Sequence, residues 1–255
     1  MDNDRSQPAG GAPPALTIAL WGASQVGKTT TLAAYFGRQT PEWVAQIDED
    51  TRKTLRRFAV IWDALRRNQL VPGTLGPRLF SLRHRAGPLL TFRDMQGGDV
   101  RNPEGSGEGP SLFAADAALI FCEWPGPRTA DSETALQNAL IELLPERPAA
   151  VVITKCEAHL DEAEFLRFAS APLEFAAAHP PLGPLVPLLR QASTHFRQLQ
   201  IAPVTVYGWN GGRPAHSYDE FGRLVPWQIN PAEVERPFAF ILGALRAAAG
   251  SRGTS

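Results

Sequence analysis

The fold is decided by residues 15–37, ALTIALWGASQVGKTTTLAAYFG, in which an apolar run, a turn of small residues and an alanine- and leucine-rich segment follow one another. The run ALTIALW at residues 15–21 is short and largely apolar, which is typical of a strand that is covered on both faces of a parallel sheet. Residues 29–36 predict a helix. The chain therefore passes from a buried strand through a glycine turn directly into a helix.

The turn matches the pattern G-x-x-x-x-G-K-[ST] in the strand-to-helix context that this pattern requires. Its glycines allow successive backbone N–H groups to face an anion, and the positive end of the following helix adds to the attraction. We expect Lys28 to reach the outer phosphates of a nucleoside triphosphate, where it would also act in catalysis, and the hydroxyl of Thr29 to bind Mg²⁺. The expected nucleotide-binding residues here are Gly22, Ala23, Ser24, Gln25, Val26, Gly27, Lys28, Thr29 and Thr30.

Strands and helices alternate along the rest of the chain. The segments at residues 78–85 and 89–95 flank an AGP turn and predict an antiparallel hairpin. Further strands are expected at residues 117–122, 149–155 and 202–208. Helices are expected at 41–70, at 131–144 with Asp131 or Ser132 as cap, at 160–199 with a break at HPPLGP, and at 230–250, opened by Asn230 and Pro231.

This alternation predicts an α/β protein with a three-layer α/β/α P-loop NTPase fold and a mostly parallel sheet carrying one antiparallel hairpin. The domain should span residues 15–249, with helical insertions near 38–72 and 160–199. Residues 1–14 are polar and rich in glycine and proline and predict a disordered tail, and residues 250–255 a second tail.

Composition argues against a nucleic-acid partner, a membrane span and a disulfide framework. The formal net charge is -1, from 25 basic and 26 acidic side chains, and the basic ones are scattered, so no nucleic-acid partner is expected. No segment reaches the roughly 18 apolar residues that span a bilayer. The two cysteines, Cys122 and Cys156, lie in apolar runs, where we expect small core residues rather than a disulfide. We therefore expect a soluble protein of the cytoplasm.

A second candidate for the metal side of the site follows the hairpin. Asp94 ends its second strand and opens a D-x-x-G pattern that closes on Gly97. A carboxylate beside the phosphate-binding turn can hold Mg²⁺ through water, and the N–H of Gly97 can bind the γ-phosphate. The following residues suit a loop that orders with the γ-phosphate. Thr74, just before the hairpin, is either a third Mg²⁺ ligand with a catalytic role or an ordinary turn residue.

The base must be read elsewhere, and Thr154, Lys155 and Glu157 follow a predicted buried strand. A carboxylate there can accept hydrogen bonds from the ring N–H and the exocyclic amine of guanine, while the lysine stem packs over the base. The alternative is a surface Lys-Glu pair. A backbone N–H near Thr205 or Val206 is expected to contact the guanine carbonyl.

Taken in this order, the motifs resemble those of Ras-like P-loop GTPases of the translation-factor (TRAFAC) class, in which the base motif is [NT]-K-x-D. This resemblance covers residues 15–249 apart from the two insertions. Within that class, the chain is also similar to the bacterial double-GTPase modules of signalling and conflict systems. It implies GTP and GDP as ligands, Mg²⁺, and a molecular switch with a protein effector or activator. The chain departs from the pattern at Glu157, which replaces aspartate, and at Gly98, which stands where many relatives carry a water-positioning glutamine.

Hydrolysis is therefore expected to be slow, with Gln96 as the polar residue of that loop that remains to orient water. Two other functions stay open. One is a P-loop ATPase or small-molecule kinase, although RHRAGP is too short for the arginine-bearing lid of a kinase. The other is a nucleotide-locked adaptor that binds without turnover.

Overall fold

The computed structural model describes residues 15–39, 43–44, 49–69, 78–84, 89–94, 112–123, 129–218, 220 and 224–252. Seven strands form the main sheet, in the order β2-β3-β4-β1-β5-β6-β7. The pairs β4-β1, β1-β5, β5-β6 and β6-β7 are parallel, whereas β3 runs antiparallel to β4 and β2 antiparallel to β3. The strands are β1 (Leu16–Trp21), β2 (Trp43–Val44), β3 (Arg78–His84), β4 (Leu89–Asp94), β5 (Ala117–Glu123), β6 (Ala149–Thr154) and β7 (Leu199–Pro203).

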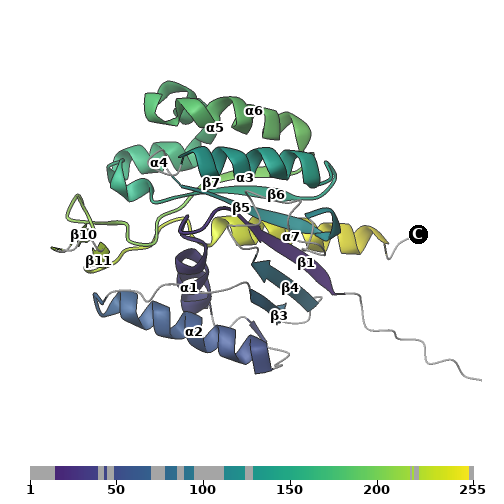
Figure 1. Cartoon of the computed structure of the whole chain (residues 1–255), viewed down its shortest axis with the longest axis horizontal. Coiled ribbons are helices and arrows are strands. Elements are labelled where there is room, and N and C mark those ends of the chain that lie inside the picture. The colour runs from purple at the N-terminus through teal and green to yellow at the C-terminus, as the bar shows by residue number, and fades with distance from the viewer. Residues whose placement is uncertain are drawn as a thin grey trace, which may run out of the picture.

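Helices cover both faces of this sheet, which makes the predicted three-layer α/β/α architecture correct (Figure 1). One face packs against α1 (Lys28–Gln39), α2 (Glu49–Arg66) and α7 (Arg236–Arg252). The other packs against α3 (Thr129–Glu142), α4 (Glu162–Ser170), α5 (Pro172–Ala178) and α6 (Val186–His195), which lie at the top of Figure 1.

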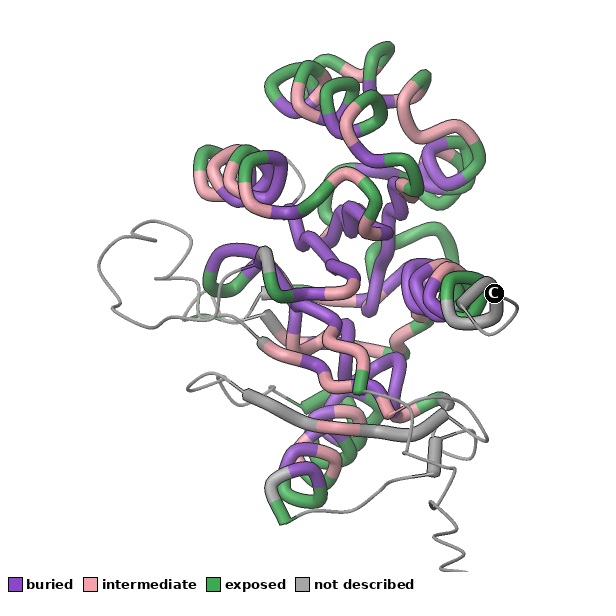
Figure 2. The backbone as a smooth tube through the Cα atoms, turned by 90° about the vertical axis from the view of Figure 1, so that its right-hand side faces the viewer, coloured by how far each residue is buried: buried purple, intermediate pink, exposed green. Residues whose placement is uncertain are grey.

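The central strands β1, β5 and β6 are mostly apolar because both of their faces are buried. In β1, Ala19 and Trp21 belong to the core cluster on the α3 side, whereas Ile18 and Leu20 belong to the cluster on the α1 side. Figure 2 shows that buried residues gather in the middle of the molecule and that exposed residues lie on the outer helices. Alternate residues along each strand thus belong to two different core clusters, one on each face of the sheet. Neither face of the run ALTIALW is therefore exposed to solvent in the way that would require a row of polar residues.

Short elements complete the chain. Between β7 and α7 lie two small antiparallel pairs, β8 (Trp209–Asn210) with β9 (Arg213–Pro214) and β10 (His216–Tyr218) with β11 (Leu224–Pro226). The described residues also form the 3-10 segments η2 (Leu112–Ala114), η3 (Cys156–Ala158) and η4 (Pro180–Leu185). In Figure 1 the β10-β11 pair lies at the same end of the molecule as the start of α1.

Most expected elements are found, including the helix after the glycine turn, the β3-β4 hairpin and the interrupted helices between residues 160 and 199. The expectation of one or two helices in residues 41–70 is partly correct, because α2 begins at Glu49 but Trp43 and Val44 pair with β3 as an edge strand. No helix within the described part of the chain is long and apolar enough to cross a membrane.

Three expected boundaries are wrong. Helix α3 begins at Thr129, so Asp131 and Ser132 lie inside it and do not cap it. Strand β7 spans Leu199–Pro203 instead of residues 202–208, because its register is set by pairing with β6. Helix α7 begins at Arg236 and not at Asn230, because Ala232 exchanges two backbone hydrogen bonds with Thr205 and holds the chain in an extended form.

Candidate functional site

The turn at residues 22–29, called here the 22–29 loop, joins the carboxyl end of β1 to the start of α1. Its backbone is left-handed at Gly22 (φ 140°), Gln25 (φ 64°) and Gly27 (φ 92°). Gly22 also touches β5, since a Cβ at this position would lie 2.6 Å from the carbonyl oxygen of Phe121. The curl of the loop and its close approach to the sheet both require the glycine at position 22.

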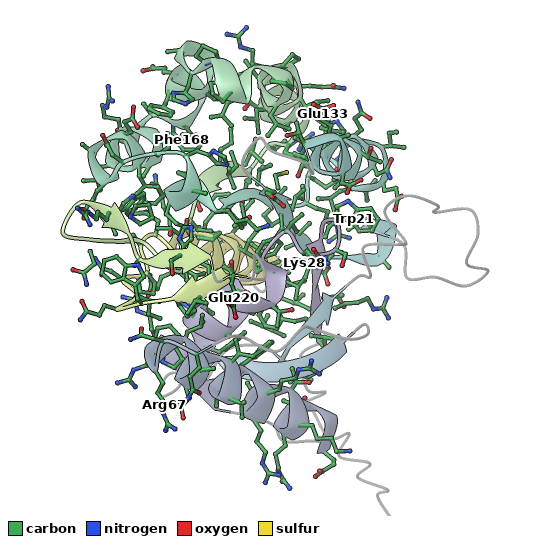
Figure 3. All side chains as sticks on the ribbon, turned by 60° about the vertical axis from the view of Figure 1, so that its left-hand side comes forward. Trp21, Lys28, Arg67, Glu133, Phe168 and Glu220 are labelled. Carbon is green, nitrogen blue, oxygen red and sulfur yellow. The ribbon has the colours of Figure 1, made fainter. Side chains whose placement is uncertain are left out.

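Lys28 is folded over this loop. Its Nζ donates hydrogen bonds to the carbonyl oxygens of Gly22, at 2.5 Å, and Ala23, at 3.1 Å, and the residue is only 8% exposed. Figure 3 shows Lys28 in the interior of the molecule, whereas Arg67 lies at its outer surface beside α2. The ammonium group is therefore held where the loop backbone curls.

The first turn of α1 points its N–H groups toward the same loop. The helix begins at Lys28, and the first hydrogen bond that closes onto the loop joins the N–H of Thr31 to the carbonyl of Gly27 at 2.9 Å. Helices leave the N–H groups of their first turn without helical partners, and the helix dipole makes this end attractive to anions. Thr29 and Thr30, both half-buried, carry hydroxyls in this turn.

The end of β6 supports the loop from the side. The hydroxyl of Thr154 lies 2.6 Å from the carbonyl oxygen of Val26 and 3.2 Å from that of Cys122. A Cβ on Gly27 would lie 3.5 Å from the same hydroxyl oxygen, so the loop passes directly over Thr154. The predicted base motif therefore begins with a residue whose hydroxyl is already engaged by the 22–29 loop.

Lys155 comes next and has an unusual backbone. Its φ is 61°, a left-handed value that is uncommon for a lysine. Its Nζ forms an ion pair with Glu123 Oε2 at 2.9 Å. Glu123, the last residue of β5, was not among the site residues expected from the sequence. A signal for it was present, because β5 and β6 are neighbouring parallel strands. A carboxylate that ends one strand and a lysine that follows the other therefore lie at the same edge of the sheet.

Glu157 lies in η3 and is almost fully buried, with 2% of its surface exposed. Its carboxylate is hydrogen-bonded by the Thr205 side chain and by the backbone N–H groups of Glu157 and Tyr207, whereas Oε2 is buried with no hydrogen-bond partner among the described residues. Burial raises the pKa of this carboxyl from 4.5 to about 7, and the hydrogen bonds and Lys155 oppose the rise.

The structure thus brings together the two segments that were expected from the sequence to read a base. Thr205 is buried, and its hydroxyl accepts a hydrogen bond from the N–H of Gly208 at 2.8 Å while it donates to Glu157. The N–H of Thr205 is bonded to the carbonyl of Ala232 at 3.1 Å. The N–H of Thr205 is therefore already used within the protein. The N–H of Val206 is the remaining candidate for the expected hydrogen bond to the guanine carbonyl.

The metal side of the predicted site is described only in part. Asp94 is the last residue of β4 and pairs with Leu20 in β1, which places its backbone at the same edge of the sheet as the 22–29 loop. Its side chain lies outside the described part of the structure. Thr74, Gln96, Gly97 and Gly98 also lie outside the described residues.

Comparison with known proteins adds no assignment, because the chain matches no protein-family model and has no significant match among curated proteins.

Proposed function

We propose that this protein binds guanine nucleotides at the 22–29 loop and acts as a molecular switch with slow, Mg²⁺-dependent GTPase activity. The observation that carries the proposal is the combination of a left-handed glycine loop, the start of a helix and the buried Lys28 at one point of the sheet edge. These are the features that hold phosphates in nucleotide-binding proteins.

The phosphates would be held by the loop backbone and by Lys28. The ammonium group now binds two neutral carbonyl oxygens, and phosphate oxygens are stronger acceptors because they carry charge. Binding of a nucleotide therefore exchanges these two hydrogen bonds for contacts with phosphate. The positive end of α1 favours the same negative charge.

Mg²⁺ fits the residues at this edge, since hydroxyl and carboxylate oxygens are the ligands it prefers. Thr29 and Asp94 would hold it, with Thr74 as a further ligand. When bound, the ion neutralises charge on the β- and γ-phosphates. The loops that carry Thr74 and Gly97 would then be the parts that a protein effector or activator reads.

Guanine would be read by Glu157 together with the N–H of Val206. The free Oε2 of a buried carboxylate lacks a donor among the described residues, and guanine offers two N–H donors on one edge. Adenine cannot supply the same pair, and the wrong base would leave the carboxylate unsatisfied. Gly98 supplies no side chain to orient water, so turnover is expected to be slow and Gln96 or a partner would assist it.

The experiment that tests this function is calorimetric titration of the purified protein with GDP and with ADP, each with Mg²⁺. We expect GDP to bind at least roughly a hundredfold more tightly, which is about 2.7 kcal/mol. Lys28→Ala is the control, because it should abolish binding of both diphosphates while the thermal transition remains cooperative. Undiminished binding in this variant would remove the phosphate role of the 22–29 loop.

A second candidate is a P-loop ATPase, and the nearly complete burial of Glu157 favours it. A carboxylate that is 2% exposed and bonded to Thr205 can be a structural group rather than one that reads a base. Equal affinity for ADP and GDP would select this function. Tight GTP binding without release of phosphate would instead select the nucleotide-locked adaptor.

Whichever of these functions holds, we propose a location in the reducing cytoplasm, because Cys122 and Cys156 are buried free thiols.

A further inference from the structure

Glu123 is a buried carboxylate that is paired with an ammonium group. The residue is 8% exposed, and its Oε2 lies 2.9 Å from the ammonium of Lys155. Its backbone is fixed, because its N–H donates to the hydroxyl of Ser132 at 3.0 Å. A carboxylate in such a place is costly unless a cation accompanies it.

Lys155, the cation of this pair, is itself held in a strained conformation. A left-handed backbone at a residue with a long side chain persists only where its surroundings impose it, and such residues gather at functional sites. With this backbone the Nζ of Lys155 lies against Glu123 at the end of β5, whereas Glu157, two residues later, is buried.

The register of the sheet makes this pair part of one frame with the 22–29 loop. Glu123 is the parallel-strand partner of Thr154, whose hydroxyl bonds to Val26 in the loop, and Lys155 follows Thr154 directly. The ion pair therefore joins the end of β5 to Lys155. This residue lies between Thr154, which contacts the proposed phosphate-binding loop, and Glu157, the proposed base-reading residue.

We propose that Glu123 is a positioning residue that fixes the Lys155 side chain beside the base of the bound nucleotide. This role rests on the proposed function. A lysine has four rotatable side-chain bonds, and fixing them costs entropy. Since Glu123 holds Lys155 in the nucleotide-free protein, that cost is met during folding and not during binding. The role concerns the nucleoside part of the ligand and leaves the phosphates to Lys28.

The test compares two ligands and four proteins. Binding of GDP and of inorganic pyrophosphate, each with Mg²⁺, is measured by calorimetry for the wild type, Glu123→Gln, Lys155→Met and the double variant. Glutamine keeps the size of the side chain and removes its charge. We expect Glu123→Gln to weaken GDP roughly 3- to 10-fold, as loss of one pre-ordered side chain predicts, and to leave pyrophosphate unchanged.

The double variant shows whether Glu123 acts through Lys155. If it does, Glu123→Gln causes no further loss once Lys155 is methionine. A matched control is Glu235→Gln, which removes the carboxylate of a more exposed ion pair with Arg38 at 3.1 Å and should leave both ligands unaffected.

Several outcomes overturn the proposal. Unchanged GDP affinity in Glu123→Gln, with the wild type binding GDP, removes the role of Glu123 and leaves the proposed function intact. Equal weakening of GDP and pyrophosphate, or additive losses in the double variant, shows a structural carboxylate instead. A wild-type protein that binds neither ligand overturns the proposed function, and the role of Glu123 with it.

Discussion

The hydroxyl of Thr154 donates a 2.6 Å hydrogen bond to the carbonyl oxygen of Val26, although 128 residues separate the two along the chain. This bond fixes the 22–29 loop against the end of β6. Loops normally lie on surfaces and move, but a loop that must present its N–H groups in one arrangement needs support from rigid elements. Thr154 supplies it from a strand whose six residues are all buried.

The first prediction concerns this support. Thr154→Val keeps the shape of the side chain and removes the donor, so the buried Val26 carbonyl loses its partner. We expect the free energy of unfolding, measured with urea, to fall by about 1–2 kcal/mol. Thr154→Ser should recover most of the loss.

Thr134→Val is the matched control, since the Thr134 hydroxyl bonds to Ala130 on an exposed part of α3 at 2.9 Å. Its effect should stay within about 0.5 kcal/mol. Equal effects of the two valine substitutions would show that the Thr154 bond gives the loop no special support.

The second prediction concerns the contact between α1 and α2. A Cβ on Gly37 would lie 2.4 Å from Cγ of Trp62, in the part of that side chain nearest the backbone, so Trp62 cannot turn away cheaply. We expect Gly37→Ala to lower the free energy of unfolding by about 1–3 kcal/mol, as overpacking does.

Gly243 in α7 offers the opposite case, because nothing lies within 4 Å of the Cβ that alanine would add. Gly243→Ala should raise the free energy of unfolding by about 0.5–1 kcal/mol, through the helix preference of alanine. Effects of the same sign in the two variants would contradict the packing seen between α1 and α2.

The third prediction concerns the pH dependence of stability. Burial raises the pKa of Glu157 to about 7 from 4.5, so between these values the folded protein holds a proton that the unfolded chain has released. Unfolding then releases this proton, and stability falls as the pH rises through that window. We expect Glu157 to make the free energy of unfolding about 2–3 kcal/mol lower at pH 8 than at pH 5.

Glu157→Gln has no such proton, and its amide keeps an oxygen that can accept from Thr205. The difference in the free energy of unfolding between wild type and variant should therefore change by this amount between pH 5 and pH 8. Parallel pH profiles for the two proteins would show that Glu157 ionises at its ordinary pKa in the folded state.

The fourth prediction concerns the thiols. Burial raises the pKa of Cys122 to about 12 and that of Cys156 well above its ordinary value, with the nearby charge of Glu157 adding to the second. Because the thiolate is the reactive form, neither cysteine should react with a thiol-specific disulfide reagent at pH 8 while the protein is folded. Both should react in urea. Rapid reaction of either thiol in the folded protein would contradict its burial.

The sequence allowed the strand, loop and helix at residues 16–39 to be predicted because the signals there are local. An apolar run and a glycine pattern carry the information within a few residues. The start of α7 could not be found in this way. Asn230 and Pro231 have the composition of a helix start, but the exchange of hydrogen bonds between Ala232 and Thr205 overrides it, and that contact joins segments far apart in the chain.

The candidate site shows the same division. Gly22, Lys28 and Glu157 could be selected from patterns, whereas the support of Val26 by Thr154 depends on the pairing of β6 with β5 and of β5 with β1. Glu123 is intermediate: its place at the end of a buried strand was visible in the sequence, but the left-handed backbone that turns Lys155 toward it was not.

The close approach at Gly22 limits how this chain can vary. Any side chain there would meet the Phe121 carbonyl at 2.6 Å, and one at Gly208, where φ is 68°, would meet the carbonyl oxygen of Asn230 at 1.9 Å. Both obstacles are backbone atoms, so no exchange of a neighbouring side chain can remove them. Distant relatives should therefore keep glycine at these two positions even where overall identity has been lost, and the pair, together with the lysine at 28, forms a signature by which such relatives can be recognised.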